Sequence, residues 1–320
     1  MGDAWILNTD TAPSITIKKV GVFLGAEVSG VDLTKPLDKD TVIKIGQAHA
    51  EFGLLIFPDQ KISSEDLKRF ARNYGELTVH PFSSSTEDAP ELIVYDQKEG
   101  NPPPPTDIWH TDETFRECPP MGTVLCSKII PDVGGDTAFI SMSAVYEGLS
   151  DKLQIFLSGL EAVHDFKPFK TLFPETREGI ERLRKFEDMY PTSVHPIVTV
   201  HPLTGKKILF VNPQFTIKIK GMEEDESNTI LNLLFRKTYI HEYQYRHTWE
   251  EDMVLFWDNR CVQHSALHDY YPKHRKMERV TIRGERPIAA SQAADLSTVR
   301  RYLSPPVMAF ADRQKRQHEL

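Results

Sequence analysis

The sequence predicts a mostly β protein with added α-helices, arranged as an antiparallel β barrel or jelly roll that the helices decorate. Short apolar and β-branched segments, bounded by glycine- and proline-rich turns, make up most of the chain. Helical patterns are few and lie early in the chain or between strands, which argues against the regular strand–helix order of a Rossmann sheet. The chain also has no glycine-rich phosphate loop of the Rossmann or Walker type, so nucleotide chemistry lacks its usual signal.

The first part of the chain alternates strands with helices. Three glycines interrupt the β-branched residues of the first strand-forming segment, as expected for short strands joined by tight turns. Gly53 ends the first helical pattern, and Ser63 with Asp66 matches a capping box that opens the second. We therefore expect strands within 15–31 and at 54–57, and helices at 38–52 and 63–74.

The remainder of the chain is predicted to be mainly strands. Four successive prolines exclude regular structure in 99–105. The charged and irregular segment 166–190 predicts a lid or an insertion, and the last thirty residues predict a surface helix or tail. No repeat or linker divides the chain, so residues 1–320 are expected to form one domain. The patterns predict strands at 124–130, 137–140, 198–201, 207–211, 253–257 and 276–282, and helices at 143–160 and 223–235.

Charge and composition exclude several classes of protein. The chain has 38 Lys and Arg against 46 Asp and Glu, a formal net charge of -8, so nothing drives it globally towards nucleic acid. No apolar run approaches the roughly 18 to 20 residues of a membrane helix, and no secretory signal is recognisable. Three cysteines are too few for a disulfide framework. We expect a cytoplasmic protein with neither nucleic acid nor membrane as partner.

The tripeptide His110-Thr111-Asp112 is the sharpest candidate for chemistry. Two residues apart on an extended chain, His110 and Asp112 project to the same face, where an imidazole and a carboxylate can meet one ion. His264 would complete a set of two histidines and one carboxylate, which leaves positions on a ferrous ion open for a chelating cosubstrate and dioxygen. Taken alone, the tripeptide also fits a structural histidine bonded to a neighbouring acid.

A strand after His264 adds two arginines. Arg275, Met277 and Arg279 share one face by alternation. Arginines that point into a barrel are costly unless they meet anions. One could hold the distal carboxylate of 2-oxoglutarate and the other an anionic group of a second substrate. The alternative is that both lie at a rim and pair with acids such as Glu278 or Asp269.

Longer motifs carry a family resemblance. The chain closely resembles the taurine dioxygenase family of Fe(II)- and 2-oxoglutarate-dependent oxygenases, in the same order from about residue 15 to 287. The resemblance implies a double-stranded β-helix (jelly-roll) core, Fe(II), 2-oxoglutarate and O2 as cofactor and cosubstrates, and a homodimer or homotetramer. The motifs are Trp109–Phe115, Pro119-Pro120, Gly134–Thr137, Trp257–Arg260, Gln263-His264 and Asp269 to Arg279.

The resemblance also implies roles for individual residues. It implies that the iron ligands are His110, Asp112 and His264, that 2-oxoglutarate binds to Thr137 and Arg275, and that the main substrate contacts His80, Thr106, Phe215 and Arg279. Thr106 and Ser83 stand where the taurine enzymes have asparagine and tyrosine, and the loop 166–173 also differs. These departures argue against taurine itself, while an anionic head group is still expected.

The sequence therefore predicts an oxidoreductase that hydroxylates a small anionic sulfonate or sulfate ester and releases succinate and CO2. The acid at Asp112 favours hydroxylation, because related halogenating enzymes have a small residue there. Within the same chemistry, the alternatives are a carboxylate such as an aryloxyalkanoate, or a secondary metabolite derived from an amino acid. A non-catalytic metal-binding jelly roll is the alternative from another class.

Overall fold

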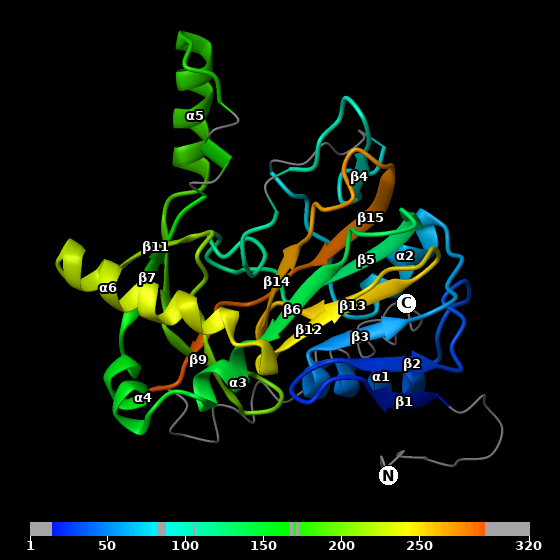
Figure 1. The fold of residues 1–320 in the computed structure, drawn as a ribbon, viewed down its shortest axis with the longest axis horizontal. Coiled ribbons are helices and arrows are strands. Elements are labelled where there is room, and N and C mark those ends of the chain that lie inside the picture. The colour runs from blue at the N-terminus through cyan, green and yellow to red at the C-terminus, as the bar shows by residue number, and fades with distance from the viewer. Residues whose placement is uncertain (1–14, 82–87, 105, 167–168, 171–172, 292–320) are drawn as a thin grey trace, which may run out of the picture.

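A seven-stranded sheet forms the centre of the computed structural model, which describes residues 15–81, 88–104, 106–166, 169–170 and 173–291 (Figure 1). The strand order is β1-β2-β3-β13-β5-β15-β4. Only the β2–β3 pair is parallel; the other neighbours are antiparallel. The strands are β1 (Thr16–Lys19), β2 (Ala26–Ser29), β3 (Leu54–Phe57), β4 (Ile93–Gln97), β5 (Gly122–Ile129), β13 (Val254–Asp258) and β15 (Arg275–Ile282).

Three smaller sheets complete the β structure, in the orders β12-β6-β14, β11-β7-β8 and β10-β9-β16. The predicted fold class, mostly β with added helices, is confirmed, although several of these strands are only three or four residues long and were not predicted. Their bounds are β6 (Thr137–Ser141), β7 (Glu161–His164), β8 (Ser193–Pro196), β9 (Val198–Val200), β10 (Lys207–Leu209), β11 (Thr216–Ile219), β12 (Gln244–His247), β14 (Val262–Ala266) and β16 (Ile288–Ala289).

The two early helices begin where the sequence predicts; the first also ends there, whereas the second ends two residues before the predicted Tyr74. The Asp38 carboxylate accepts from the Thr41 amide at 2.9 Å to cap α1 (Lys39–Phe52), and Gly53 ends this helix at a φ of 68°. Ser63 and Asp66 form the expected capping box of α2 (Ser64–Arg72). Local capping chemistry thus defines both helices.

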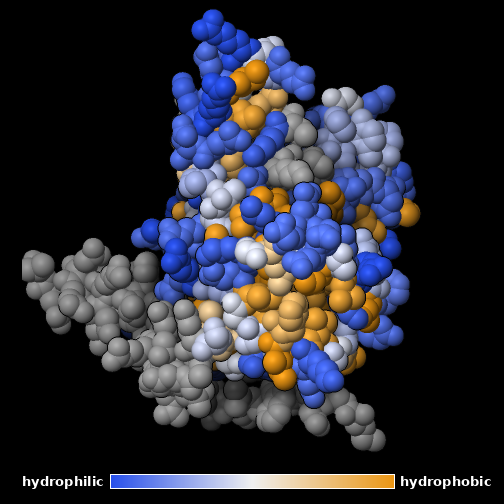
Figure 2. Space-filling view, turned by 90° about the vertical axis from the view of Figure 1, so that its left-hand side faces the viewer, coloured by the Kyte–Doolittle hydropathy of each residue, from blue (hydrophilic) through white to orange (hydrophobic). Residues whose placement is uncertain are grey.

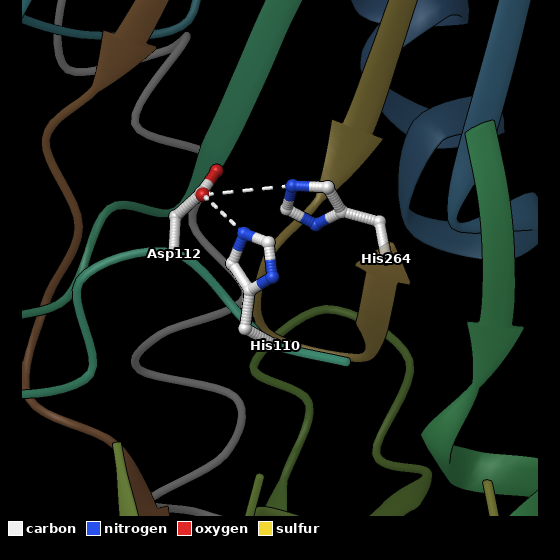
Figure 3. Close-up of side chains that lie close together, drawn as sticks. All are labelled: His110, Asp112 and His264. Atoms are coloured by element: carbon white, nitrogen blue, oxygen red, sulfur yellow. Dashed lines mark ion pairs between the residues drawn. The ribbon is translucent and has the colours of Figure 1, made fainter. Parts of the chain in front are cut away.

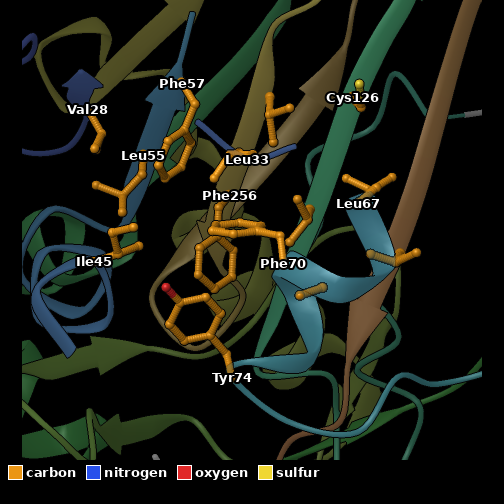
Figure 4. Packing of buried hydrophobic residues seen from close by; sticks show 14 of the residues in the cluster. Val28, Leu33, Ile45, Leu55, Phe57, Leu67, Phe70, Tyr74, Cys126 and Phe256 are labelled. Carbon is orange, nitrogen blue, oxygen red and sulfur yellow. The ribbon is translucent and has the colours of Figure 1, made fainter. Parts of the chain in front are cut away.

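Helices α1 and α2 bury the largest apolar cluster of the protein against the seven-stranded sheet (Figure 4). The Phe70 ring meets those of Phe57 and Phe256 edge to face, with centroids 5.4 Å and 5.9 Å apart. Tyr74 also contacts Phe256, at 5.0 Å. Such aromatic pairs stabilise a core beyond the effect of buried area. The cluster fixes β13 and β5, which lead directly into the candidate site.

The prediction of one helix at 143–160 was wrong. Two short helices, α3 (Met142–Glu147) and α4 (Asp151–Leu157), occupy this segment. Gly148 ends α3 where a Cβ would lie 2.2 Å from the Tyr243 hydroxyl, and Ser150 caps α4. The apolar pattern predicted one helix with a buried apolar face, but two of the apolar residues, Ile155 and Phe156, are 74% and 46% exposed. Figure 2 shows the side of the protein on which α4 and α6 (Glu224–Phe235) lie, where apolar side chains reach the surface.

The segment 166–190, predicted to be a lid or an insertion, contains a helix that the sequence pattern did not indicate. Residues Arg177–Met189 form α5, capped by the Thr176 hydroxyl, and this helix projects from the body of the protein (Figure 1). Leu183 and Phe186 of α5 pack against an aromatic cluster of Phe115, Phe166 and Phe215. Residues 167–168 and 171–172 of this segment, Ser83, and the predicted C-terminal helix or tail beyond residue 291 lie outside the described residues. No described helix is long and apolar enough to cross a membrane.

Candidate active site

Three predicted ligands meet at one point (Figure 3). Asp112 Oδ1 lies 3.7 Å from Nε2 of His110 and 3.7 Å from Nε2 of His264. All three residues are buried, and their ligand atoms lie within 4.8 Å of one another. His110 and Asp112 belong to the loop before β5, whereas His264 lies on β14. The fold therefore joins two segments that are far apart in sequence.

Backbone hydrogen bonds hold these segments together. The His110 amide donates to the His264 carbonyl at 3.0 Å, and the His264 amide donates back at 2.8 Å. Between the two loop ligands, the Thr111 hydroxyl donates to the Val262 carbonyl at 3.0 Å. These hydrogen bonds attach the loop to β14. The positions of the ligands therefore do not depend on side-chain packing alone.

The protonation of His110 suits a ligand. Its Nδ1 lies 2.7 Å from the Ile108 carbonyl oxygen, which can only accept, so Nδ1 carries the proton and the lone pair is on Nε2. Burial lowers the pKa of both His110 and His264. Both rings are therefore neutral at pH 7, which is the state that binds metal ions.

The two oxygens of Asp112 have different surroundings. Oδ1 faces the histidines, whereas Oδ2 accepts from the Thr123 hydroxyl at 2.6 Å and pairs with Arg279 Nη2 at 2.8 Å. Burial works to raise the pKa of Asp112, but Arg279 and then the two histidines lower it well below its usual range. A charged carboxylate oxygen and two neutral imidazole nitrogens converge here, and this donor set fits Fe(II).

A second group of potential ligands has a structural role instead. His201, Asp258 and Cys261 also lie close together. His201 Nε2 bonds to Asp258 Oδ2 at 3.0 Å, while its Nδ1 accepts from two backbone amides. Asp258 is also bound by the Arg260 guanidinium. Both nitrogens of His201 are engaged, so it has no lone pair to offer to a metal ion.

Arg275 is a buried cation without an anion. It is 7% exposed and lies between the rings of Tyr270 and Trp249, at 5.6 Å and 6.0 Å from their centroids. Among the described residues it has no ion pair, and its Nε has no hydrogen-bond partner. The predicted alternative of rim pairing is wrong for Arg275, since Asp269 accepts from the Gly135 amide and Glu278 pairs with Lys128.

Thr137 and Arg279 are the other two predicted residues near Arg275. The Thr137 hydroxyl accepts from the Trp249 indole at 3.0 Å, so its own proton is left for another acceptor. Arg279 donates to the Tyr95 hydroxyl at 3.1 Å besides pairing with Asp112. As alternation along β15 predicts, Arg275, Met277 and Arg279 are all buried. Both arginines face inward, as the sequence suggested.

One cavity unites most of the predicted residues. It has an empty volume of about 580 Å³, is open to solvent, and is lined by His110 and His264 together with Thr106, Thr137, Arg275 and Arg279. The Thr106 hydroxyl lies 3.2 Å from His268 Nε2. Two of the three candidate metal ligands and two guanidinium groups therefore open on the same space, while Asp112 is not among the lining residues.

His80 and Phe215 lie on another side of the site, among the aromatic residues. The Phe215 ring is 6.3 Å from that of His110 and 5.4 Å from that of Phe115, centroid to centroid. His80 lies edge to face with Phe169 at 5.8 Å, and burial lowers its pKa. Neither residue lines the 580 Å³ cavity.

Sequence reasoning missed four residues that shape the site. Thr123, Tyr95 and Trp249 each bond to a predicted residue, as described above. The fourth, Glu113, follows a ligand directly, is 1% exposed and has a φ of 48°. Its carboxylate binds Arg116 Nε at 2.6 Å, which holds an otherwise unfavourable backbone conformation in place. A polar residue inside a buried strand, as at Thr123, was the one signal available.

Comparison with known proteins identifies the family. The family of taurine catabolism dioxygenases, TauD and TfdA, matches residues 16–281. The chain belongs to this family. The TauD/TfdA relatives include an alkylsulfatase of Acinetobacter baylyi, 34% identical over 85% of the chain and 86% of the relative. An alpha-ketoglutarate-dependent sulfonate dioxygenase of Saccharomyces cerevisiae is 33% identical over 86% of the chain and 68% of the relative.

Solved structures agree with this assignment. A taurine dioxygenase from Burkholderia xenovorans superposes with a TM-score of 0.74 and 33% identity, over 87% of this chain and 93% of that one. The TauD/TfdA resemblance and the jelly-roll fold class are thereby confirmed. The chain is an oxidoreductase of the 2-oxoglutarate-dependent dioxygenase class, which uses Fe(II), 2-oxoglutarate and O2. The alternative of a non-catalytic metal-binding protein is set aside.

Proposed function

We propose that the chain hydroxylates a small organic sulfate ester or sulfonate, with His110, Asp112 and His264 as its iron ligands. The observation that carries this proposal is the inward face of β15, where Arg275 and Arg279 open on the same cavity as the two histidines. One buried guanidinium suits the cosubstrate, and the other suits a second anion.

Each residue has a distinct task in this proposal. Bound iron supplies the activation of dioxygen, coupled to the decarboxylation of 2-oxoglutarate to succinate and CO2. Arg275 binds the distal carboxylate of the cosubstrate, and the Thr137 hydroxyl donates to it. Arg279 holds the sulfate or sulfonate group and so positions the neighbouring C–H bond. The apolar side chains of Leu125 and Met277 exclude water from the cavity wall.

The products follow from the position of the new hydroxyl group. Hydroxylation of the carbon that carries a sulfate ester gives a hemiacetal ester, which eliminates sulfate and a proton and leaves an aldehyde. Hydroxylation next to a sulfonate similarly releases sulfite. One oxygen atom of O2 enters the substrate and the other enters succinate. The assay therefore has two independent readouts, succinate and the inorganic sulfur anion.

The test is a substrate screen with anaerobically reconstituted protein. Fe(II) and 2-oxoglutarate are added, then alkyl sulfates, alkanesulfonates and aryloxyalkanoates are compared for succinate release on admitting air. We expect the sulfur compounds to stimulate turnover. If only aryloxyalkanoates did so, the carboxylate alternative would replace this proposal, because Arg279 can bind a carboxylate with the same geometry.

Variants of one strand give a matched control. Arg279→Lys keeps a cation beside Asp112 but loses the two-pronged donor geometry, so kcat/KM for the sulfur substrate should fall at least about tenfold. Lys276 lies on the opposite face of β15, and Lys276→Ala should leave kcat/KM unchanged. Equal losses in both variants would contradict a role for Arg279 in binding the anion.

Three further expectations belong to this proposal. We propose that residues 1–320 form one domain, in which the segment 166–190, with α5, acts as a lid. A homodimer or homotetramer is expected from the family resemblance, and size-exclusion chromatography with light scattering tests it. A cytoplasmic location is expected from the sequence composition, and fractionation of the source cells tests that.

A further inference from the structure

We propose that Thr123 is a positioning residue, which, with Asn259 and Trp257 behind it, makes Asp112 bind metal through Oδ1 alone. This inference rests on the proposed function, because it concerns the same metal site. Of these three residues, only Thr123 was described above, as the hydrogen-bond donor to Asp112. They form a chain of hydrogen bonds that ends on the carboxylate ligand.

The indole of Trp257 fixes which atom donates in each hydrogen bond of this series. The indole N–H of Trp257 can only donate, and it lies 3.0 Å from Asn259 Oδ1. The side-chain nitrogen of Asn259 is thereby directed to Thr123 Oγ1, at 2.9 Å. Since Thr123 Oγ1 accepts this bond, its single proton is directed to Asp112 Oδ2, at 2.6 Å. Asp112 Oδ2 is therefore always an acceptor.

As a result, the two oxygens of the Asp112 carboxylate have different partners. Oδ2 is taken by the Thr123 hydroxyl and by Arg279 Nη2. Oδ1 is left to face Nε2 of His110 and His264. A carboxylate whose second oxygen already accepts a hydroxyl proton and pairs with a guanidinium group presents one oxygen to a metal ion, which keeps further coordination positions open.

The central sheet holds this series of hydrogen bonds in place. Thr123 of β5 pairs directly with Trp257 of β13. The side chains of Thr123, Asn259 and Trp257 are at most 1% exposed, so water does not compete for these bonds. Outer hydrogen bonds of this kind commonly change metal affinity by about 10- to 100-fold when they are removed.

Neighbouring threonines offer a matched pair of variants. Thr123→Val removes the hydroxyl with little change in shape, and Thr123→Ser keeps it. Thr281 is the cross-strand neighbour of Thr123 on β15; it is also fully buried, but its hydroxyl bonds to Thr78 at 2.6 Å. Thr281→Val therefore removes a hydroxyl from the same sheet without touching Asp112.

The experiment is an anaerobic titration of the metal-free protein with Co(II), followed by its visible absorption bands. We expect Thr123→Val to weaken Co(II) binding at least about tenfold and to shift the bands, while Thr123→Ser and Thr281→Val bind within about threefold of the wild type. Thr123→Val with wild-type affinity and bands would overturn the inference. If Thr123→Val fails to fold, Asn259→Leu, which removes the amide that donates to Thr123 with little change in side-chain size, must shift the bands; unchanged bands would overturn the inference equally.

The same titration separates this inference from the proposed function. Wild-type protein that binds Co(II), with binding lost in His264→Ala, supports the metal site whatever Thr123→Val does. Wild-type protein that binds no Co(II) overturns the metal site, and the role of Thr123 with it.

Discussion

A Cβ atom on Gly135 would lie 3.1 Å from both Cδ and Nε of Arg275. Gly135 also has a φ of 77°, in the left-handed region. The turn before β6 therefore needs glycine for two reasons, backbone conformation and room for the arginine. The Gly134-Gly135 pair, seen in the sequence only as part of a motif, shapes the candidate site for 2-oxoglutarate.

Gly135→Ala should consequently weaken 2-oxoglutarate binding. The new methyl group displaces the Arg275 guanidinium, so we expect the Kd for 2-oxoglutarate, measured by anaerobic titration of the Fe(II) protein, to rise about tenfold or more. Gly221→Ala is the control, because Gly221 has a φ of 80° with no atom within 4 Å of the added Cβ. An equal rise in both variants would mean that backbone strain alone is responsible.

The ion pair between Asp112 and Arg279 should be costly to break. Both residues are buried, with Oδ2 and Nη2 2.8 Å apart. In metal-free protein, Asp112→Asn leaves the arginine without its anion, and the free energy of unfolding should fall by about 3 to 5 kcal/mol. Urea unfolding in a chelator measures this loss. The double variant with Arg279→Met should lose less than the sum of the single losses, and strict additivity would refute the coupling.

Acid should destabilise the protein partly through His247. Burial lowers the pKa of this histidine from 6.5 to about 4. Below pH 6.5 the unfolded chain therefore binds a proton that the folded chain does not, so stability falls as the pH drops towards 4. From pH 7 to pH 5 this one group removes about 2 kcal/mol. Urea unfolding of His247→Phe should show a correspondingly weaker pH dependence; an unchanged slope would exclude His247 as a source.

The aromatic core behind the site should dominate stability. Phe256 is fully buried and contacts Phe70 and Tyr74 (Figure 4). Phe256→Ala should lower the free energy of unfolding by about 3 to 5 kcal/mol, because it removes these contacts and leaves a cavity. Val22 is 73% exposed, and Val22→Ala should change stability by less than about 0.5 kcal/mol in the same assay.

The sequence predicted features that depend on local chemistry. Caps and breakers such as Gly53 and the Ser63–Asp66 capping box act within a few residues, and each was correctly placed. The helix predicted at 143–160 is interrupted at Gly148, where the hydroxyl of Tyr243, a residue distant in sequence, leaves no room for a side chain. The four-residue strands β8 and β12, which were not predicted, carry too few residues for a period to be recognised.

In the candidate site, too, local patterns predicted some residues and missed others. Motifs and alternation along one strand brought His110, Asp112, His264 and the two arginines to notice. The partner of Asp112 at Thr123 was missed, because their contact depends on how the loop before β5 folds back on that strand, which no local pattern encodes. The sequence also left open whether Arg279 pairs with a rim acid, and only the fold places it against Asp112.

Strand β15 sets the distance between Arg275 and Arg279. Four residues of extended chain separate Arg275 from Arg279, and each contributes about 3.3 Å, so their backbones stand about 13 Å apart. In the proposed function, in which each arginine binds one anion, the two anions would therefore be held at a set separation, with Asp112 paired to the Arg279 end of it. A longer substrate cannot stretch this interval and must extend away from the strand. Selection among homologous alkyl chains would then act on the far wall of the pocket, while the anchoring end stays constant.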